Sequence, residues 1–335
     1  MTEPLTIVTG APGWIGSRLV GALHGRVRCL VGPDADAAAI GSVRAEVVRG
    51  DLTNASSLEP LFRDATGATV YHLAGVIHPT RGVRQFYDVN VGGTDHLLRL
   101  SEQARVRRFV YLSSNSVVGV SRDPSTVFDE TTPIHPYMNY GRSKKAAEDL
   151  VRAAANRGTI ETAIVRAPWF YGPDQPPRQS EFFTMIRTGR VPLVGDGTNA
   201  RSMAYVDNLA QGLVLAGTHA AARNGTFWIA DRRPYTMNDI ISTIADVMEQ
   251  DFNIPVTRRV IRVPAFTSDV AQLADGALQA LGMYNQKIHV LSEMSRTIAC
   301  SVARAERELG YAPAIELREG MRRSIAWMRE HDIAF

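Results

Sequence analysis

The fold is decided by the stretch Leu5-Thr6-Ile7-Val8-Thr9-Gly10-Ala11-Pro12-Gly13-Trp14-Ile15-Gly16, close to the start of the chain. Residues 5–9 form a nearly continuous apolar run, which is typical of a strand buried on both faces of a parallel sheet. A helical pattern follows over residues 17–23. A strand, a glycine-rich turn and a helix in this order predict a cradle that binds the pyrophosphate of a dinucleotide at the helix N-terminus.

Each glycine of this stretch has a role in such a cradle. Gly10 permits the tight turn, Gly13 lets the backbone approach the pyrophosphate, and Gly16 lets the helix pack close to the strand. The spacing G-x-x-G-x-x-G is a variant of the usual fingerprint. The alternative interpretation is a glycine-rich turn with a purely structural role.

Strands and helices alternate through the first half of the chain. Further strands are expected at residues 27–31, 45–49, 69–73, 109–112 and 159–166, and a long helix at 82–105. Six strands that alternate with helices predict a doubly wound parallel sheet, the Rossmann fold, with right-handed crossovers. Four prolines between 168 and 177 mark a loop that leads out of the sheet. We therefore predict a dinucleotide-binding domain over 1–166, to which 202–231 returns, and a smaller C-terminal α/β substrate-binding domain formed by 167–201 and 232–335.

Composition excludes several classes of protein. The 335 residues are 45% hydrophobic and 21% charged, and the net charge of +3 is too small to indicate nucleic-acid binding. Cys29 and Cys300 are too few for a disulfide framework, so we expect both to be buried in a reduced, cytoplasmic protein. The apolar strand follows the N-terminus so closely that we expect no signal peptide. We also expect no membrane insertion, because no apolar run is long enough, and no metal site, because no cluster has ligand spacing.

A second motif, Tyr140-Gly141-Arg142-Ser143-Lys144, predicts acid–base chemistry. On a helix, a phenol and an ammonium four residues apart share one face. The ammonium would lower the pKa of the tyrosine from its usual ~10, so that the pair can exchange a proton with a substrate oxygen. Ser113-Ser114-Asn115-Ser116 follows the fifth strand, at the edge where open α/β sheets bind ligands. A hydroxyl there could hold a substrate carbonyl beside Tyr140; a hydrogen-bonded serine turn is the alternative.

Residues at the ends of two strands bear on the choice of cofactor. The second strand ends in Val31-Gly32-Pro33-Asp34. It lacks the usual acid for the adenosine ribose, and no arginine sits at the strand tip to bind a 2′-phosphate. Asp34 comes late and after a proline, so the choice between NAD and NADP stays open. Asp51, at the end of the third strand, could accept a hydrogen bond from the adenine amino group or cap the helix that starts near Ser56.

Three further features carry an expectation. His72 lies within a strand and is expected to be a hydrogen-bonded core histidine. Asn90 and Gly93 are poor helix formers inside a predicted helix, which indicates a specific local role. An apolar stripe at helical spacing predicts a helix packed on the core; it consists of Phe266, Val270, Leu273, Ala277 and Leu281. The alternatives are an apolar lid over the substrate and, less favoured because a strongly basic opposite face is lacking, a helix on a membrane surface.

Together, the motifs resemble those of the extended short-chain dehydrogenase/reductases over nearly the whole chain. They are Gly10-x-x-Gly13-x-x-Gly16, Asp51-Leu52, His72-Leu73-Ala74-Gly75, Asn90-Val91-x-Gly93-Thr94, Tyr111-Leu112-Ser113-Ser114, Tyr140-x-x-x-Lys144, Arg166-Ala167-Pro168-Trp169-Phe170-Tyr171-Gly172-Pro173, Gly195-Asp196-Gly197, Tyr205-Val206-Asp207-Asn208 and Leu309-Gly310-Tyr311-x-Pro313. The resemblance implies that Ser114 orients the substrate oxygen, Tyr140 moves the proton, and Lys144 binds the nicotinamide ribose and tunes the tyrosine. It also implies a homodimer through the helices of Asn90 and Tyr140. The cofactor contacts that it implies are Gly10, Gly13, Trp14, Ile15, Gly16, Asp51, Leu52, Leu73, Ala74, Gly75, Asn90, Tyr140, Lys144 and Ala167.

The family resembled here holds both oxidoreductases and nucleotide-sugar epimerases or dehydratases. The sugar-nucleotide branch usually carries an asparagine that contacts the diphosphate where this chain has Trp169, and an indole suits an apolar wall better. The C-terminal part, from residue 259 to 311, resembles the 3β-hydroxysteroid dehydrogenase-like branch. Arg201 favours the sugar-nucleotide branch instead, because enzymes of that branch use an arginine after the glycine turn to hold phosphate.

With Ser116, Trp169 and Arg201 as expected substrate contacts, we predict an NAD(P)-dependent oxidoreductase. It would interconvert a secondary alcohol and a ketone on an apolar, steroid-like or polyketide-like small molecule. The alternatives are a nucleotide-sugar epimerase or dehydratase that recycles NAD internally, and a cofactor-binding regulator without turnover.

Overall fold

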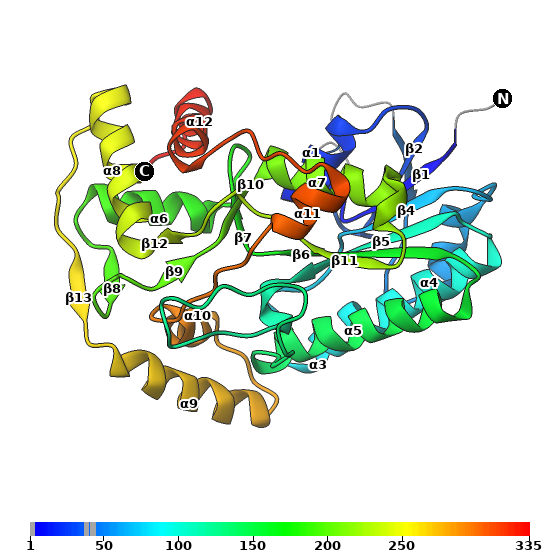
Figure 1. Cartoon of the computed structure of the whole chain (residues 1–335), viewed down its shortest axis with the longest axis horizontal. Coiled ribbons are helices and arrows are strands. Elements are labelled where there is room, and N and C mark those ends of the chain that lie inside the picture. The colour runs from blue at the N-terminus through cyan, green and yellow to red at the C-terminus, as the bar shows by residue number, and fades with distance from the viewer. Residues whose placement is uncertain (1–3, 37–39, 41–44) are drawn as a thin grey trace.

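A parallel sheet forms the centre of the molecule (Figure 1). The computed structural model describes residues 4–36, 40 and 45–335. Within these residues the sheet has seven strands in the order β11-β6-β5-β4-β1-β2-β3. They are β1 (Thr6–Thr9), β2 (Val27–Val31), β3 (Ala45–Arg49), β4 (Thr69–His72), β5 (Arg108–Ser114), β6 (Glu161–Ala167) and β11 (Gly225–Trp228). The predicted doubly wound parallel sheet is confirmed, and β11 from the segment 202–231 adds a strand beside β6.

Helices cover both faces of this sheet (Figure 1). On one face α1 (Trp14–Ala22) and α7 (Val206–Thr218) share a buried apolar cluster with the strands. On the other face α4 (Gly93–Gln103) and α5 (Met138–Arg157) share a second cluster. The strands supply both clusters because alternate side chains, such as Ile7 and Val8, point to opposite faces. Shorter helical segments are α2 (Ala55–Leu58), η2 (Glu59–Phe62), α3 (Arg84–Phe86), η3 (Tyr87–Gly92) and η4 (Asn115–Val117).

The helix predicted over 82–105 is not continuous. It consists of α3, the π-helical segment η3, and α4. The buried side chain of Asn90 causes the interruption, because it bonds both the N–H of Val76 (2.7 Å) and its carbonyl (3.0 Å). A Cβ on Gly93 would lie 2.8 Å from the Cβ of Leu52, so this position needs a glycine. The expected local roles of Asn90 and Gly93 are confirmed.

The rest of the chain builds a smaller α/β part beside the carboxyl ends of the strands. Its core lies mainly between α6, α8 and α12. The strand pairs β7–β10, β9–β12 and β8–β13 lead into it. The elements are β7 (Trp169–Tyr171), α6 (Pro177–Arg187), β8 (Pro192–Val194), β9 (Ala200–Arg201), β10 (Met203–Tyr205), β12 (Tyr235–Thr236), α8 (Met237–Phe252), β13 (Ile261–Val263), α9 (Phe266–Ala280), α10 (Gln286–Glu293) and α12 (Leu317–Glu330). Two further elements, η5 (Ala220–Ala222) and α11 (Ala303–Leu309), pack against β11 and α7 of the sheet domain instead.

The apolar stripe forms a helix, α9, but the predicted packing of that stripe on the core is wrong. Phe266 is 65% exposed, Val270 58% and Leu273 78%. The buried positions of α9 are instead Ser268, Ala271, Asp275 and Gln279. The polar side faces the protein because its side chains form hydrogen bonds with α5 and α10, described below.

Both cysteines are buried and free, as expected. Burial raises the pKa of the Cys29 thiol to about 11 and that of Cys300 to about 12. Among the helices of the described residues, none combines the length and apolarity that crossing a membrane requires.

Candidate active site

The glycine-rich turn forms an open anion site at the start of α1. Gly10 has a φ of 78°, and its carbonyl accepts the N–H of Gly13 (3.0 Å). A Cβ on Gly16 would lie 2.0 Å from the Gly10 oxygen, so the helix approaches the turn more closely than any other residue type permits. The N-cap, Gly13, provides no side-chain cap, and the first turn holds no acidic residue. The N–H groups at 14–16 are therefore free to bind a pyrophosphate, which the cradle fits.

Neighbouring strand ends bring the other predicted cofactor contacts to this turn. The Trp14 indole donates to the Pro173 carbonyl (2.6 Å) and so ties the turn to the loop after β7. Leu73 and Ala74 follow β4 directly, and a Cβ on Gly10 would lie 2.8 Å from the Ala74 nitrogen. A Cβ on Gly75 would lie 3.1 Å from Asn90 Oδ1 and 3.9 Å from Lys144 Nζ. The structure thus brings the turn, the loop after β4, and Asn90 and Lys144 to one edge of the sheet.

His72 is a core histidine, as expected. Its Nδ1 bonds the Thr9 hydroxyl (2.7 Å), and its Nε2 bonds the Thr94 hydroxyl (3.0 Å). Burial, with a smaller contribution from Lys144, lowers the pKa of His72 to about 3. The ring is therefore neutral at physiological pH and supports the strand ends.

Asp51 does not cap a helix. Its carboxylate accepts the N–H of Thr53 (2.8 Å) in a local turn, whereas the N-cap of α2 is Asn54. That leaves the interpretation of Asp51 as an exposed acceptor beside the cofactor site. Leu52, the next residue, is buried under Gly93 and offers its carbonyl to His96 (2.9 Å).

An arginine does lie at the tip of β2, contrary to expectation. Arg49 ends β3 and pairs in register with Val31. Its Nη1 donates to the carbonyls of Gly32, Pro33 and Ala35 at 3.0–3.2 Å. The chain order hid this contact, because the arginine comes from the adjacent strand. Asp34 is exposed on the same turn.

The three predicted catalytic residues meet at the carboxyl end of β5. Ser114 ends β5, and Tyr140 and Lys144 lie on the first turns of α5. The Ser114 hydroxyl lies near enough to the Tyr140 phenol to influence the pKa of the tyrosine. Burial, with a smaller contribution from the Glu293 carboxylate, raises the pKa of Tyr140 to about 12, although Ser114 and Arg178 lower it. The expected lowering of this pKa by Lys144 is therefore wrong for this structure.

Lys144 is held in place by strand β5. Its Nζ donates to the Leu112 carbonyl (2.6 Å) and lies 4.2 Å from the centre of the Tyr111 ring. Burial lowers the pKa of Lys144 to about 7, although Glu148 raises it. This lysine can therefore gain or lose a proton near neutral pH.

A buried ion pair that sequence reasoning missed fixes α5 against the sheet. Glu148 is fully buried and accepts two hydrogen bonds from Arg166 of β6, each of 2.9 Å, and one from Ser113 (2.6 Å). Glu148 follows Lys144 by one helical turn, and this spacing could have indicated that both side chains lie on the same face of the helix. The pair positions the face of α5 that carries Tyr140 and Lys144.

The predicted substrate contacts have different surroundings. Ser116 is buried beside Ser114, and the predicted cofactor contact Ala167 pairs in register with Ser114 across β5 and β6. The Trp169 ring packs edge-on against Phe182 (5.6 Å). Arg201 is held by Glu293: its Nη2 donates to the Glu293 carbonyl (2.6 Å), and its Nη1 lies 3.8 Å from the carboxylate.

Side chains from distant segments gather near the phenol, and nothing in the sequence pattern indicated this. The Phe86 ring lies 5.8 Å from Tyr140 and 5.6 Å from Tyr284. The Tyr284 hydroxyl bonds His78 Nδ1 (2.7 Å), and Arg178 bonds the other nitrogen of that ring. These contacts span up to 206 positions of the sequence, so no local motif could reveal them.

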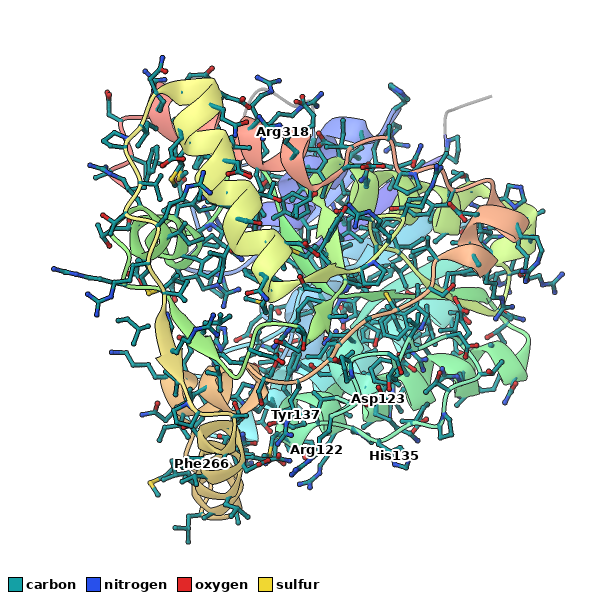
Figure 2. All side chains as sticks on the ribbon, turned by 60° about the vertical axis from the view of Figure 1, so that its left-hand side comes forward. Arg122, Asp123, His135, Tyr137, Phe266 and Arg318 are labelled. Carbon is teal, nitrogen blue, oxygen red and sulfur yellow. The ribbon has the colours of Figure 1, made fainter. Side chains whose placement is uncertain are left out.

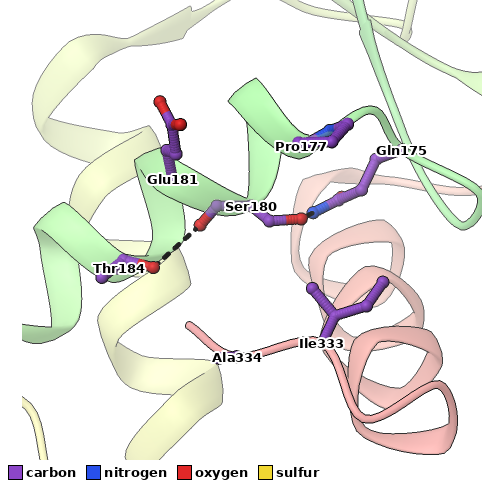
Figure 3. Close-up of a pocket in the computed structure, with 7 residues that line it drawn as sticks. All are labelled: Gln175, Pro177, Ser180, Glu181, Thr184, Ile333 and Ala334. Carbon is purple, nitrogen blue, oxygen red and sulfur yellow. Dashed lines mark hydrogen bonds between the residues drawn. The ribbon is translucent and has the colours of Figure 1, made fainter.

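A pocket of about 410 Å³ lies away from these residues (Figure 3). It is bounded by α6 and the C-terminal tail, and its lining is Gln175, Pro177, Ser180, Glu181, Thr184, Ile333 and Ala334. Because the lining includes none of the predicted site residues, we assign no part of the reaction to this pocket. In the part of the chain that the structure describes, no group of three or more His, Cys, Asp or Glu side chains could hold a metal ion.

Comparison with known proteins connects this geometry to a family. The chain is 44% identical to the uncharacterized protein y4nL of Sinorhizobium fredii, over all of this chain and 98% of that protein. It is 28% identical to a dTDP-glucose 4,6-dehydratase of Streptomyces griseus, over 97% of this chain and 94% of the relative. It is 27% identical to 3beta-hydroxysteroid-dehydrogenase/decarboxylase isoform 1 of Arabidopsis thaliana, over 97% of this chain and 79% of that protein.

Solved structures show the same fold. The dTDP-glucose 4,6-dehydratase of Bacillus anthracis, solved in complex with NAD, superposes with a TM-score of 0.77 at 20% identity, over 98% of each chain. The model of the NAD dependent epimerase/dehydratase family matches residues 6–230, which include the glycine turn and the Ser114, Tyr140 and Lys144 positions. The chain belongs to the NAD-dependent epimerase/dehydratase family.

Proposed function

We propose that this enzyme is an NAD(P)-dependent oxidoreductase that interconverts a secondary alcohol and a ketone on a largely apolar substrate. The observation that best supports this proposal is the contact of Arg201 with Glu293. Its guanidinium is bound by the Glu293 backbone and faces the Glu293 carboxylate. A diphosphate at Arg201 would be repelled by that carboxylate, whereas an uncharged substrate would not.

The site residues provide what such a reaction needs. When bound, the cofactor donates or accepts a hydride. The Tyr140 phenol donates a proton to the ketone oxygen, or takes one from the alcohol, and Ser114 hydrogen-bonds the same oxygen. Lys144 lies beside Gly75 and Asn90, where it can bind the ribose. Because its pKa is about 7, it can also pass a proton to the phenol or take one from it.

Aromatic rings support an apolar substrate. Phe86 packs against Tyr140, and Trp169 packs against Phe182 where the sugar-nucleotide branch would place an amide. These rings offer apolar surface and few hydrogen-bond partners for sugar hydroxyls.

A nucleotide-sugar epimerase or dehydratase is the second candidate, and one observation favours it. The Nε of Arg201 is buried without a hydrogen-bond partner among the described residues, so this guanidinium keeps a free donor. In that case NAD would be reduced and reoxidised within one cycle. Relatives at a similar level of identity include both a dehydratase and a 4-hydroxy-2-methyl-3-oxo-4-farnesyl-3,4-dihydroquinoline-1-oxide ketoreductase of Stigmatella aurantiaca.

The deciding experiment follows the absorbance of reduced nicotinamide with purified enzyme. Hydroxysteroid-like alcohols and nucleotide sugars are offered in separate panels, with NAD or NADP, and sugar conversion is followed by chromatography. Net cofactor reduction by an alcohol is the expected result. Sugar conversion without net reduction would overturn the proposal in favour of the second candidate.

Tyr140→Phe tests the role of the phenol. We expect turnover to fall by about 10²–10⁴-fold, because the proton donor is lost while the ring remains. Tyr137→Phe is the matched control: Tyr137 is also buried and hydrogen-bonds Ser292 (2.7 Å), but it precedes the motif by one turn. Cofactor affinity, measured by fluorescence titration, should stay within a few-fold of wild type in both variants. Near-normal turnover of Tyr140→Phe would refute the assigned role.

A further inference from the structure

The outer face of α9 is apolar and exposed to solvent. Phe266, Val270, Leu273 and Leu281 are between 58% and 78% exposed, and Ala274 and Ala277 lie exposed between them. Neither acidic residue of the helix contributes to this face, because Asp269 is paired with Arg122 and Arg296 and Asp275 with His289. An ordinary surface helix has the reverse arrangement, with its apolar side towards the core.

Polar contacts on the inner face fix this orientation. Gln279 accepts hydrogen bonds from the backbone (3.0 Å) and side chain (2.9 Å) of Asn139, the neighbour of Tyr140. Asp275 bonds His289 of α10 (2.7 Å), and the Ser268 hydroxyl donates to the Leu291 carbonyl (2.8 Å). Turning the apolar side inward would break these buried bonds, so the exposure is a property of the fold.

Neighbouring residues extend the apolar surface beyond the helix. Ile261 on β13 is 46% exposed, Met283 after the helix 48%, and Val290 on α10 46%. Figure 1 shows α9 along the lower edge of the molecule, and Figure 2 shows Phe266 on this helix at the same edge. Several exposed apolar side chains on one helix mark an interaction site, whereas single exposed apolar residues do not.

Basic residues stand at both ends of this surface. Arg259 and Arg262 are exposed on the segment that leads into α9. At the other end, Gly282 accepts the N–H of Val83 (3.0 Å), which brings the loop with exposed Arg81 beside exposed Lys287. Arg262 lies near enough to Asp196 to lower the pKa of that carboxyl group. Of the residues that the structure describes, none forms an ion pair within 4 Å with these four side chains, so they can also bind a partner's negative charge.

We propose that α9 docks this protein on a membrane surface that carries anionic headgroups. The apolar face lies at the boundary of headgroups and acyl chains, and the four basic residues bind the headgroups at either end. A second copy of the chain suits the surface less well, because an isologous contact would bring like charges together.

The predicted dimer would form through α4 and α5, which are elements other than α9. In one respect the inference rests on the proposed function: an apolar substrate would reach Tyr140 from the lipid, beside the contact of Gln279 with Asn139.

Flotation of the full-length protein with lipid vesicles tests this inference. We expect wild type to bind vesicles of phosphatidylcholine mixed with phosphatidylglycerol, and to bind pure phosphatidylcholine at least about tenfold more weakly. Leu273→Asp should reduce binding about tenfold or more, since it places a charge in the apolar face. The matched control is Val47→Asp, at a 41% exposed position on the edge strand β3. Arg259→Gln combined with Arg262→Gln should remove most of the preference for anionic lipid.

The result does not depend on turnover, so it can fail while the proposed oxidoreductase activity stands. No vesicle binding by wild type would overturn the inference. Equal loss of binding in Val47→Asp would also overturn it. So would a wild-type dimer, seen by light scattering, that dissociates in Leu273→Asp, because α9 would then be a subunit interface.

Discussion

At the scale of single residues, Arg49 bears on the choice between NAD and NADP. It sits at the tip of β2, where an acid would bind the adenosine ribose, and this chain has Val31 in place of that acid. Among the described residues, the loop carbonyls bond Nη1 of Arg49, and a guanidinium has further donors with which it can bind a 2′-phosphate. We therefore predict that the enzyme accepts NADP and that Arg49→Ala lowers kcat/KM with NADP by about 10–100-fold.

Steady-state kinetics with both cofactors measure this effect, and Arg49→Lys serves as the control that keeps the charge. Little change with NAD is expected. An equal fall with NAD and NADP would contradict the prediction and give Arg49 a purely structural role in the loop.

The site also shows how far individual residues can be predicted from the sequence. The placement of Ser114, Tyr140 and Lys144 at one edge of the sheet was predictable, because their motifs are local and follow a strand end or lie on one helical face. Their electrostatics were not, because burial, together with Glu293 of α10 and Arg178 of α6, determines the pKa of Tyr140. The Glu293 contact with Arg201 joins residues 92 positions apart, and it changes how a motif arginine is interpreted.

At the scale of elements, α1 allows a direct test of the cofactor cradle with two glycines of one helix. A Cβ on Gly16 would lie 2.0 Å from the Gly10 oxygen, whereas a Cβ on Gly21 meets nothing within 4 Å. We predict that Gly16→Ala destabilises the protein by about 2 kcal/mol or more and abolishes cofactor binding, because the turn must move. Gly21→Ala should stabilise it by up to about 1 kcal/mol. Chemical denaturation and cofactor titration give both readouts; similar behaviour of the two variants would contradict this account.

Elements were predictable where the apolar pattern reports burial, and not where polar contacts override it. All six predicted strands are present, because strands buried on both faces read as apolar runs. The helix at 82–105 is interrupted because a buried Asn90 side chain bonds the neighbouring backbone. The orientation of α9 is opposite to its periodicity, because Asp275 and Gln279 find partners inside the protein.

At the scale of the whole molecule, the C-terminal part is tied to the sheet domain by long-range polar contacts near the active site. Gln279 bonds Asn139, Tyr284 bonds His78, and Ser292 bonds Tyr137. His289 lies among these contacts and links α9 to α10. Its Nδ1 is 2.7 Å from the Asp275 carboxylate, and its Nε2 is 3.2 Å from the Glu293 carboxylate. The titration of His289 should therefore influence how firmly the two parts are held together.

The stability of the molecule should then depend on pH through His289. Burial lowers the pKa of this ring, but its hydrogen bonds to Asp275 and Glu293 raise it more strongly, from 6.5 to about 9. The raised pKa means that the stabilisation is complete below pH 6.5, declines above it, and is lost as the pH passes 9. Against a double variant, Asp275→Asn with His289→Gln, which keeps a neutral hydrogen-bonding pair, wild type should lose about 2–3 kcal/mol between pH 7 and 9. Urea denaturation at several pH values measures the difference, and contributions shared by both proteins, such as that of Lys144, cancel. Parallel pH profiles for the two proteins would show that His289 is not charged in the folded enzyme.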